Sequence, residues 1–442
     1  MVQSVRSVNS EIPIFGDKLT TVCTHKEALP LYVMPGKNKN AESIAIPIGE
    51  SILSRHMLFL GGIGTGKTNA MNLFVRNTRR VLTDKDVVVI FDTKGDYYKE
   101  FYEPGDIVIS NDERATGSEG VDYWNIFNEV STDDRIEENV LEIANTLFAD
   151  KIKNTTQPFF PNAAKDLFFA LMLHLLRTDS LKGKRNNKSL RAYLNMMTPE
   201  LMKQVLDQHP DLNAMKSYIY DPKAGQTLGV MAELQQMIRE IFVGNFSKKG
   251  AVSMREIVKN KGGNVVFVEY DLSIGSILTP IYRLLIDLAI KETLSRKEKD
   301  GNVYFFIDEF RLLPELSHID DGINFGRSLG AKFFVGIQNI NQVLAAYGED
   351  VGRSMLSGFG TTYSFRINDG LSREFIKNLS GMNIKKQTFM SSIQTQGITE
   401  QLREAYVVED SDINNLRIGE AIVSTITGEP FVFRFNEYSS LH

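Results

Sequence analysis

The chain lacks the cysteines that covalent cross-links or sulfur-ligated metals would require. Its 442 residues contain a single cysteine, Cys23, which excludes a disulfide framework and a cysteine-based zinc or iron–sulfur site. A formal net charge of only −5 excludes a uniformly basic coat for nucleic acid, although the lumen of a ring could still be basic. The hydrophobic content of 42% is that of a globular protein, so disorder is not the main state.

Long apolar runs are also missing. The most apolar stretch, residues 167–176 (LFFALMLHLL), has ten residues, whereas a membrane-crossing helix needs about 20. We interpret it as a buried core helix. The N-terminal sequence MVQSVRSVNSEIPIFGDK has no apolar centre of a signal peptide. We therefore expect a cytoplasmic protein without its own membrane span, which a membrane protein partner would recruit to the inner face of the membrane.

Short, near-continuous apolar runs indicate parallel strands that are covered on both faces. They lie at residues 56–60, 87–91, 264–270, 303–307 and 332–337, and later strands are expected at 361–367, 420–426 and 431–435. Helical patterns lie between several of these runs, for example at 277–294. This alternation predicts an α/β fold with a mainly parallel sheet.

The stretch from about 131 to 245 has a different pattern. Apolar residues recur there at helical spacing, with helices expected at 163–177, 199–207 and 225–242 and no convincing strand. We therefore predict three parts: an N-terminal segment (1–50), a nucleotide-binding domain in two halves (51–130 and 246–442), and an all-helical insertion domain (131–245).

A phosphate-binding loop is the strongest single motif. Residues 61–68 (GGIGTGKT) fit G-x-x-x-x-G-K-[ST] between an apolar run and a helix-compatible segment. Glycines let backbone N–H groups approach phosphate oxygens, Lys67 supplies charge for the β and γ phosphates, and Thr68 offers a hydroxyl to Mg²⁺. The predicted nucleotide-binding residues are Gly62, Gly64, Thr65, Gly66, Lys67, Thr68 and Asn69.

A pair of acids follows the apolar run 303–307. We assign Asp308 to Mg²⁺, which needs a hard oxygen ligand near Thr68, and Glu309 to the catalytic base that orients the attacking water. An acidic helix cap after a strand is the alternative interpretation of the pair. Gln338 ends the next expected strand and should lie beside Asp308, where its amide could contact the γ-phosphate or the water. An ordinary polar strand end is its alternative.

The segment Asp92 to Asp96 (DTKGD) allows two interpretations. One of its carboxylates could reach the metal shell or a neighbouring subunit, or it could cap its own loop.

The ordered set of motifs resembles the type IV secretion coupling ATPases (TraG/TraD type) of the FtsK–HerA superfamily. The resemblance covers residues 40–436 and depends on GGIGTGKT, VVVIFDTKGDYY, VYFFIDEFRLLPEL and INFGRSLGAKFFVGIQNINQV. It implies a RecA-like P-loop NTPase core, a hexameric ring, ATP with Mg²⁺, and DNA translocation. It also implies an arginine finger at Arg327 and a sensor at Gln338. A surface arginine is the alternative for Arg327. Typical members begin with membrane-spanning helices, which this sequence does not show.

Two basic stretches are candidates for DNA contact, because phosphate contacts dominate non-specific affinity. One holds Lys248, Lys249, Arg255, Lys259 and Lys261; the other holds Lys182, Lys184, Arg185, Lys188 and Arg191. From them we select Lys248, Lys249, Lys184 and Arg185 as candidates. No base-reading motif is present, so we expect binding without sequence specificity.

The leading functional hypothesis is a motor that hydrolyses ATP at the subunit interfaces of a ring and moves DNA, in conjugative transfer or in a mobile-element or defence process. The alternative is a nucleotide-switched oligomeric ATPase that recruits protein effectors or secretion substrates without moving DNA. Asp308, Glu309 and Arg327 favour the motor, since a slow switch has less need of a complete hydrolytic set. A protein partner of relaxosome or membrane type fits either hypothesis.

Overall fold

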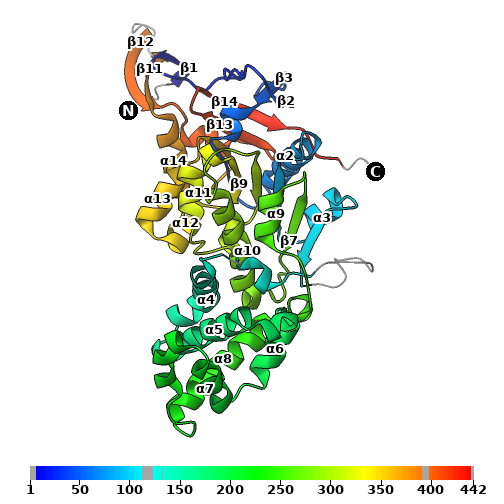
Figure 1. The fold of residues 1–442 in the computed structure, drawn as a ribbon. Helices are drawn as coiled ribbons and strands as arrows, with labels where there is room; N and C mark the ends of the chain where they lie inside the picture. Colours follow the sequence, from blue (N-terminus) through cyan, green and yellow to red (C-terminus); the bar gives the residue numbers. More distant parts are fainter. Residues whose placement is uncertain (1–5, 112–122, 132, 391–397, 440–442) are drawn as a thin grey trace. The chain divides into compact units, whose positions relative to one another are not determined.

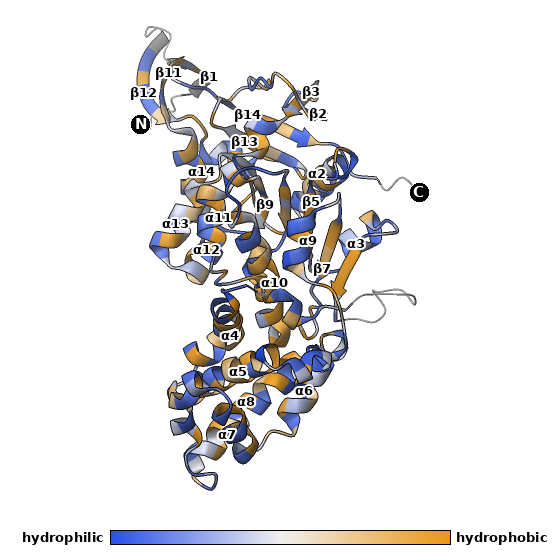
Figure 2. Cartoon of the chain, in the orientation of Figure 1, coloured by the Kyte–Doolittle hydropathy of each residue, from blue (hydrophilic) through white to orange (hydrophobic). Residues whose placement is uncertain are grey.

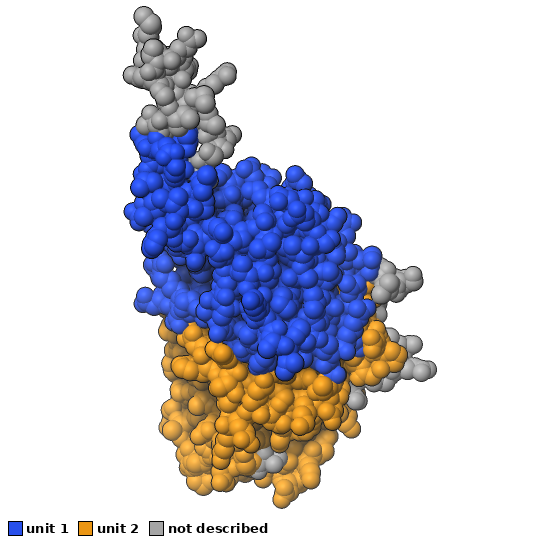
Figure 3. Space-filling view, turned by 90° about the horizontal axis from the view of Figure 1, so that it is seen from above, with its two compact units in different colours: residues 1–82, 305–311, 332–442 blue, residues 83–304, 312–331 orange. Residues whose placement is uncertain are grey.

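The computed structural model describes residues 6–111, 123–131, 133–390 and 398–439. The chain divides into two compact units, shown in different colours in Figure 3. Unit 1 comprises residues 1–82, 305–311 and 332–442, and unit 2 comprises 83–304 and 312–331. The residue boundaries of these two units differ from those of the three parts expected from the sequence.

Unit 1 is built on a mixed sheet (Figure 1). The strands that lie wholly or mainly in this unit are β2 (Tyr32–Lys37), β3 (Ser43–Ile48), β4 (Met57–Leu60), β8 (Val303–Ile307), β9 (Ala331–Ile337), β10 (Thr361–Phe365), β13 (Glu420–Thr425) and β14 (Gly428–Phe435), in the order β3-β2-β14-β13-β10-β4-β9-β8. The first residues of β8 and β9 are counted with unit 2. Strand β4 is parallel to both β9 and β10, and β13 is antiparallel to β10. The carboxyl ends of β4, β9 and β10 therefore lie at one edge of the sheet.

Aromatic side chains fix the helix that follows β4. Phe74 on α2 (Lys67–Arg80) packs edge-on against Phe59 and Tyr363, with ring centroids 5.5 Å away in each case. Phe59 itself stacks on Tyr363 at 4.9 Å. All three rings are buried, so this cluster holds the middle of α2 in a defined place against the sheet.

A second, three-stranded sheet in unit 1 was not predicted. It consists of β1 (Arg6–Phe15), β11 (Met382–Met390) and β12 (Ile398–Tyr406), all antiparallel in the order β1-β11-β12. Among its described side chains only Asn383 and Ala405 are buried. Backbone pairing rather than core burial sustains it, so the apolar pattern that reveals a strand in the sequence is absent. The remaining helices of unit 1 are α1 (Glu50–Leu53), α12 (Ile340–Tyr347), α13 (Glu349–Ser357), α14 (Gly370–Ser380) and α15 (Asp410–Asn414).

Unit 2 contains three parallel strands, β5 (Val87–Asp92), β7 (Val265–Glu269) and β6 (Ile107–Ser110), in the order β5-β7-β6. Every residue of β5 is buried, as its apolar run predicted, and Figure 2 shows β7 in the hydrophobic colour. The unit also contains α3 (Asp96–Phe101), α9 (Met254–Asn260), α10 (Gly275–Leu294), α11 (Ile319–Phe325) and the 3₁₀ turn η6 (Gly326–Leu329).

Residues 133–245 are helical, as predicted (Figure 1). Its α-helices are α4 (Ile136–Lys153), α5 (Phe159–Arg177), α6 (Asn187–Asn195), α7 (Pro199–Asp207) and α8 (Gly225–Ile241). No strand occurs within residues 133–245, all of which the structure describes. By length and composition alone α5 could cross a membrane, but 61% of its apolar window is buried inside the protein. That burial agrees with the expected core helix.

Candidate nucleotide site

The phosphate loop lies between β4 and α2 in unit 1, as its sequence predicted. Gly64 and Gly66 have φ angles of +72° and +107°, a conformation that side chains with a Cβ rarely adopt. Gly66 also caps the start of α2, and a Cβ on it would lie 2.9 Å from Gly419 Cα. The loop can therefore curl tightly at the helix start, where free N–H groups favour an anion.

Lys67 is held over this loop. Its ammonium donates hydrogen bonds to the backbone carbonyls of Gly61 at 2.6 Å and Gly62 at 2.9 Å. Burial lowers the pKa of Lys67, while the carboxylates of Asp308 and Glu309 act to raise it. The charge of Lys67 thus lies among the loop carbonyls and within the field of both acids, where it can be redirected to phosphate oxygens.

Thr68 and Asp308 meet directly, although 240 residues separate them. The hydroxyl of Thr68 donates to Asp308 Oδ2 at 2.7 Å. Asp308 follows β8, and Thr68 lies in the first turn of α2. A hydroxyl and a carboxylate oxygen in contact are hard oxygen ligands of the kind that Mg²⁺ takes in nucleotide sites. The residues therefore fit the predicted metal site.

Glu309 is surrounded by two donors. Gln338, just after β9, donates from Nε2 to Glu309 Oε1 at 2.9 Å and Oε2 at 3.1 Å. Arg311 donates from Nε to Glu309 Oε1 at 2.8 Å. The predicted closeness of Gln338 to the acid pair is thus present. Sequence reasoning missed Arg311, and its position two residues after the acid pair was the only signal that could have found it.

Asn69 contacts protein rather than pointing into an open site. Its Nδ2 donates to the carbonyl of Asn436 at 3.0 Å, and its Oδ1 accepts from the N–H of Tyr438 at 2.7 Å. Its side-chain amide is therefore used to hold the segment after β14. Its backbone N–H is what remains for a phosphate.

Arg327 lies in the 3₁₀ turn η6 of unit 2. Its side chain is exposed and makes no hydrogen bond or ion pair with the residues that the structure describes. Such an arginine is available to another molecule, but its assignment as a finger stays a prediction.

Asp92 has a local role in unit 2. It is 1% exposed and accepts from the N–H groups of Lys94 at 3.2 Å and Tyr98 at 2.8 Å. Burial raises the pKa of Asp92, and these backbone hydrogen bonds act to lower it. These contacts favour the loop-capping interpretation over a metal ligand.

The four candidate DNA contacts differ in their surroundings. Arg185 donates from Nε and Nη2 to the carbonyls of Leu175 and Leu176, at 2.9 Å and 2.8 Å, so its guanidinium stabilises the end of α5. Lys248 lies 4.8 Å from the centroid of the Tyr123 ring. Lys184 and Lys249 are exposed. These surroundings favour the two exposed lysines over Arg185 as phosphate contacts, and all four stay predictions.

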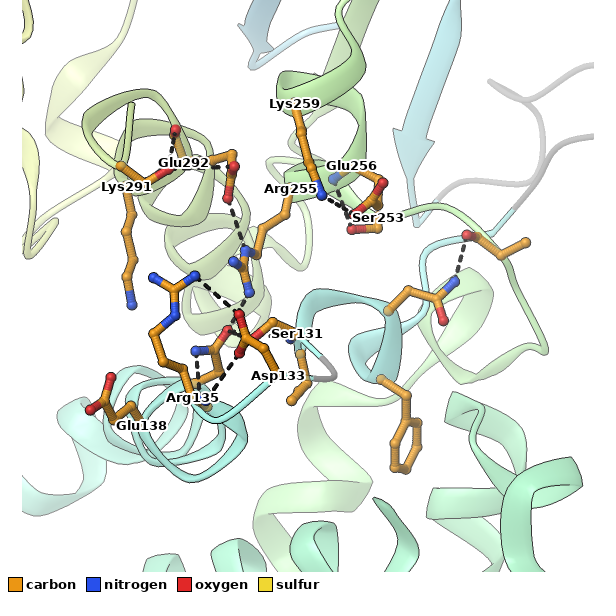
Figure 4. Close-up of a pocket in the computed structure, with 16 residues that line it drawn as sticks. Ser131, Asp133, Arg135, Glu138, Ser253, Arg255, Glu256, Lys259, Lys291 and Glu292 are labelled. Carbon is orange, nitrogen blue, oxygen red and sulfur yellow. Dashed lines mark hydrogen bonds and ion pairs between the residues drawn. The ribbon is translucent and has the colours of Figure 1, made fainter. Parts of the chain in front are cut away.

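The basic stretch 248–261 does not form one surface. Lys261 is 5% exposed and pairs with Asp300 at 2.8 Å. Arg255 lines a cavity of about 590 Å³ in unit 2, where it pairs with Glu292 at 3.2 Å (Figure 4). Four basic and four acidic side chains line this cavity, so it has no excess of positive charge for DNA.

Comparisons with known proteins place the chain in a family context. The family model described as "Type IV secretion-system coupling protein DNA-binding domain" matches residues 41–434. The coupling protein TraD of Escherichia coli (strain K12) is 23% identical over 359 residues, which are 79% of this chain and 47% of TraD. The type IV secretion system-coupling protein VirD4 of Bartonella quintana (strain Toulouse) is 24% identical over 320 residues, which are 68% of this chain and 49% of VirD4. The chain thus spans about half the length of the curated relatives it matches.

A solved structure shares the fold. The plasmid coupling protein TrwB, in complex with the non-hydrolysable ATP analogue ADPNP, matches with a TM-score of 0.70 and 17% identity, covering 99% of this chain and 97% of the other. The same protein in complex with ADP and Mg²⁺ matches with a TM-score of 0.68. The expected α/β, RecA-like P-loop core is therefore confirmed.

Proposed function

Because the chain belongs to the type IV secretion-system coupling protein family, we propose that it is an ATP-driven motor that moves DNA. The contact that carries the proposal is the 2.7 Å hydrogen bond between Thr68 and Asp308. It joins the phosphate loop to the acid pair in one compact unit. An ordinary glycine-rich surface turn would not require its lysine to lie close to two acidic residues.

The side chains divide the work of hydrolysis as follows. Backbone N–H groups of residues 62–69 bind the phosphates, and Lys67 moves from the loop carbonyls to the β and γ oxygens. Thr68 and Asp308 would hold Mg²⁺, which neutralises charge on those oxygens. Glu309 accepts the proton of the attacking water, and Gln338 and Arg311 fix its carboxylate in direction.

Assembly completes the site in this proposal. Chains form a homo-oligomeric ring, with six copies as in the family resemblance, and Arg327 of one copy stabilises the charge that develops at the site of the next. DNA passes through the lumen and is bound through its phosphates without base selection. We place the motor on the cytoplasmic side, in contact with a membrane or relaxosome protein partner.

A nucleotide switch without translocation is the second candidate. It would bind ATP, assemble and recruit protein substrates, with slow hydrolysis that DNA does not change. The two hydrogen bonds from Gln338 to Glu309 favour the motor, because a fixed orientation of the base matters more to a chain that hydrolyses ATP rapidly than to one that hydrolyses it slowly.

One experiment separates the two. The ATPase rate of the purified chain is measured without DNA and with single- or double-stranded DNA, and the oligomer mass is determined in the same samples. The motor predicts a low basal rate that rises at least tenfold with DNA, together with ring-sized particles. A rate that DNA leaves unchanged, in an ATP-dependent oligomer, supports the switch and contradicts the motor.

A further inference from the structure

The strand order in unit 1 indicates on which side of β4 each end of a bound ATP molecule would lie. The polar groups that would act on the γ-phosphate, Asp308 and Gln338, follow β8 and β9, which lie on one side of β4. Strands β10, β13 and β14 lie on the other side of β4. In a phosphate loop the backbone cradles the α and β phosphates, and the lysine reaches the β and γ phosphates. The nucleoside end therefore points toward β10, β13 and β14.

The loop before β13 contacts the phosphate loop at that side. Gly419, with a φ of +79°, donates its N–H to the carbonyl of Thr65 at 2.9 Å and accepts from the N–H of Phe435 at 2.9 Å. The residue just before it, Ile418, is 75% exposed. A large aliphatic side chain thus lies in solvent next to the phosphate loop, on the side where the nucleoside is expected.

The chain after β14 covers the neighbouring turn of α2. We define residues 436–438 as the C-terminal segment. Asn69 holds its backbone at Asn436 and Tyr438 through the two hydrogen bonds described above. The guanidinium of Arg76, further along α2, lies 5.1 Å from the centroid of the Tyr438 ring. The C-terminal segment is therefore held along the first three turns of α2.

We propose that the nucleoside of ATP binds between Ile418 and the C-terminal segment. Ile418 covers one face of the base. This contact favours binding, because it removes apolar surface of both the base and the isoleucine from water. Asn69 is a positioning residue that sets the opposite wall by fixing Asn436 and Tyr438. This inference depends on the proposed ATP site and adds the residues that recognise its nucleoside.

The test compares a ligand that has a base with one that does not. Dissociation constants for Mg·ATP and for Mg·tripolyphosphate are measured by calorimetry on the full chain. Ile418→Ala is expected to weaken ATP binding about five- to tenfold and to leave tripolyphosphate binding unchanged. The matched control is Ile426→Ala, which removes an isoleucine of similar exposure (68%) at the opposite end of β13. It should change neither constant.

Asn69→Ala provides a second, independent variant. Freed from its two hydrogen bonds, the C-terminal segment should lose protection from amide exchange, and ATP binding should weaken while tripolyphosphate binding persists. A general loss of fold would weaken both ligands, so the difference between them reports positioning.

The outcomes are separable. If Ile418→Ala and Asn69→Ala bind ATP as the wild type does, or lose ATP and tripolyphosphate equally, the nucleoside site is overturned while the phosphate site stands. If the wild type binds neither ligand, the proposed function and this inference both fail.

Discussion

The side-chain amide of Gln338 donates hydrogen bonds to both carboxylate oxygens of Glu309, at 2.9 Å and 3.1 Å. An amide that engages both oxygens fixes the plane of the carboxylate. Because Gln338 directly follows β9, a shift of this strand would change the orientation of the Glu309 carboxylate, which we assign as the base. This relationship underlies the first two predictions.

Glu309→Gln should bind ATP as the wild type does but hydrolyse it at least 100-fold more slowly, because the amide cannot accept a proton from water. The rate and the dissociation constant are measured on the same preparation. Glu349→Gln is the matched control, since Glu349 is an exposed acid of unit 1 that pairs with Arg353. Wild-type turnover in Glu309→Gln would contradict the assignment of the base.

Gln338→Ala should reduce kcat about tenfold with little change in ATP affinity, since it removes orientation of Glu309 rather than a ligand of the phosphates. Steady-state kinetics and calorimetry provide the two numbers. Gln236→Ala, at an exposed position of α8, serves as the control. An equal loss of affinity and rate would instead indicate that Gln338 binds ATP directly.

Two glycines of the phosphate loop should respond differently to alanine. Both have positive φ angles, so each substitution carries strain of about 1–3 kcal/mol. Only at Gly66 would the new Cβ also meet Gly419 at 2.9 Å; nothing lies within 4 Å of the corresponding position at Gly64. We expect Gly66→Ala to have the lower Tm and to lose ATP binding more completely. Equal effects on Tm would show that the approach of Gly419 is unimportant.

Arg327→Ala should leave ATP binding intact and abolish activity only in the assembled state, since the guanidinium acts on the neighbouring copy. Mixing Arg327→Ala chains with Lys67→Ala chains should restore part of the activity, because some interfaces then combine an intact phosphate loop with an intact arginine. In the control mixture, Arg353→Ala chains replace the Arg327→Ala chains. This mixture shows whether the loss of another exposed arginine has the same effect on activity. No recovery in the first mixture would argue against a finger in trans.

Two histidines of unit 2 should make stability depend on pH in opposite directions. The hydrogen bond from His318 Nδ1 to Asp287, together with the nearby Glu142, raises the pKa of His318 against the opposing effects of burial and Lys291. Its contribution is present below pH 6.5 and is lost as the pH rises through the higher folded value. His318→Gln should therefore destabilise the chain more at pH 5.5 than at pH 9.

His174 provides the comparison of opposite sign. Burial and the neighbouring His209 lower the pKa of His174. The folded chain resists its protonation, so wild-type stability falls as the pH drops below 6.5. His174→Gln should accordingly lessen the acid sensitivity that the wild type shows. Denaturant unfolding at several pH values measures both variants, and shifts of the same sign would contradict this account.

The sequence predicted the parts of the fold whose burial creates a pattern. The run at 87–91 became a fully buried strand, and the helical spacing between 131 and 245 became α4 to α8. The sheet of β1, β11 and β12 gave no such pattern, because its described side chains are mostly exposed and its stability comes from pairing between segments far apart in the chain. The same limit applied to Arg255 and Lys261, which seemed equivalent to the exposed Lys249 in the sequence.

By itself the sequence determined which residue types are present for the proposed phosphate end of the site. Spacing in the loop 61–68 and the acids after an apolar run require particular residue types, and these are visible in one dimension. Only the tertiary structure decided which groups meet across the sheet, such as Gln338 with Glu309, Gly419 with Thr65, and Asn69 with the C-terminal segment. The physical reason is that such contacts use backbone atoms and ordinary polar side chains, whose partners are set by strand order and not by local sequence.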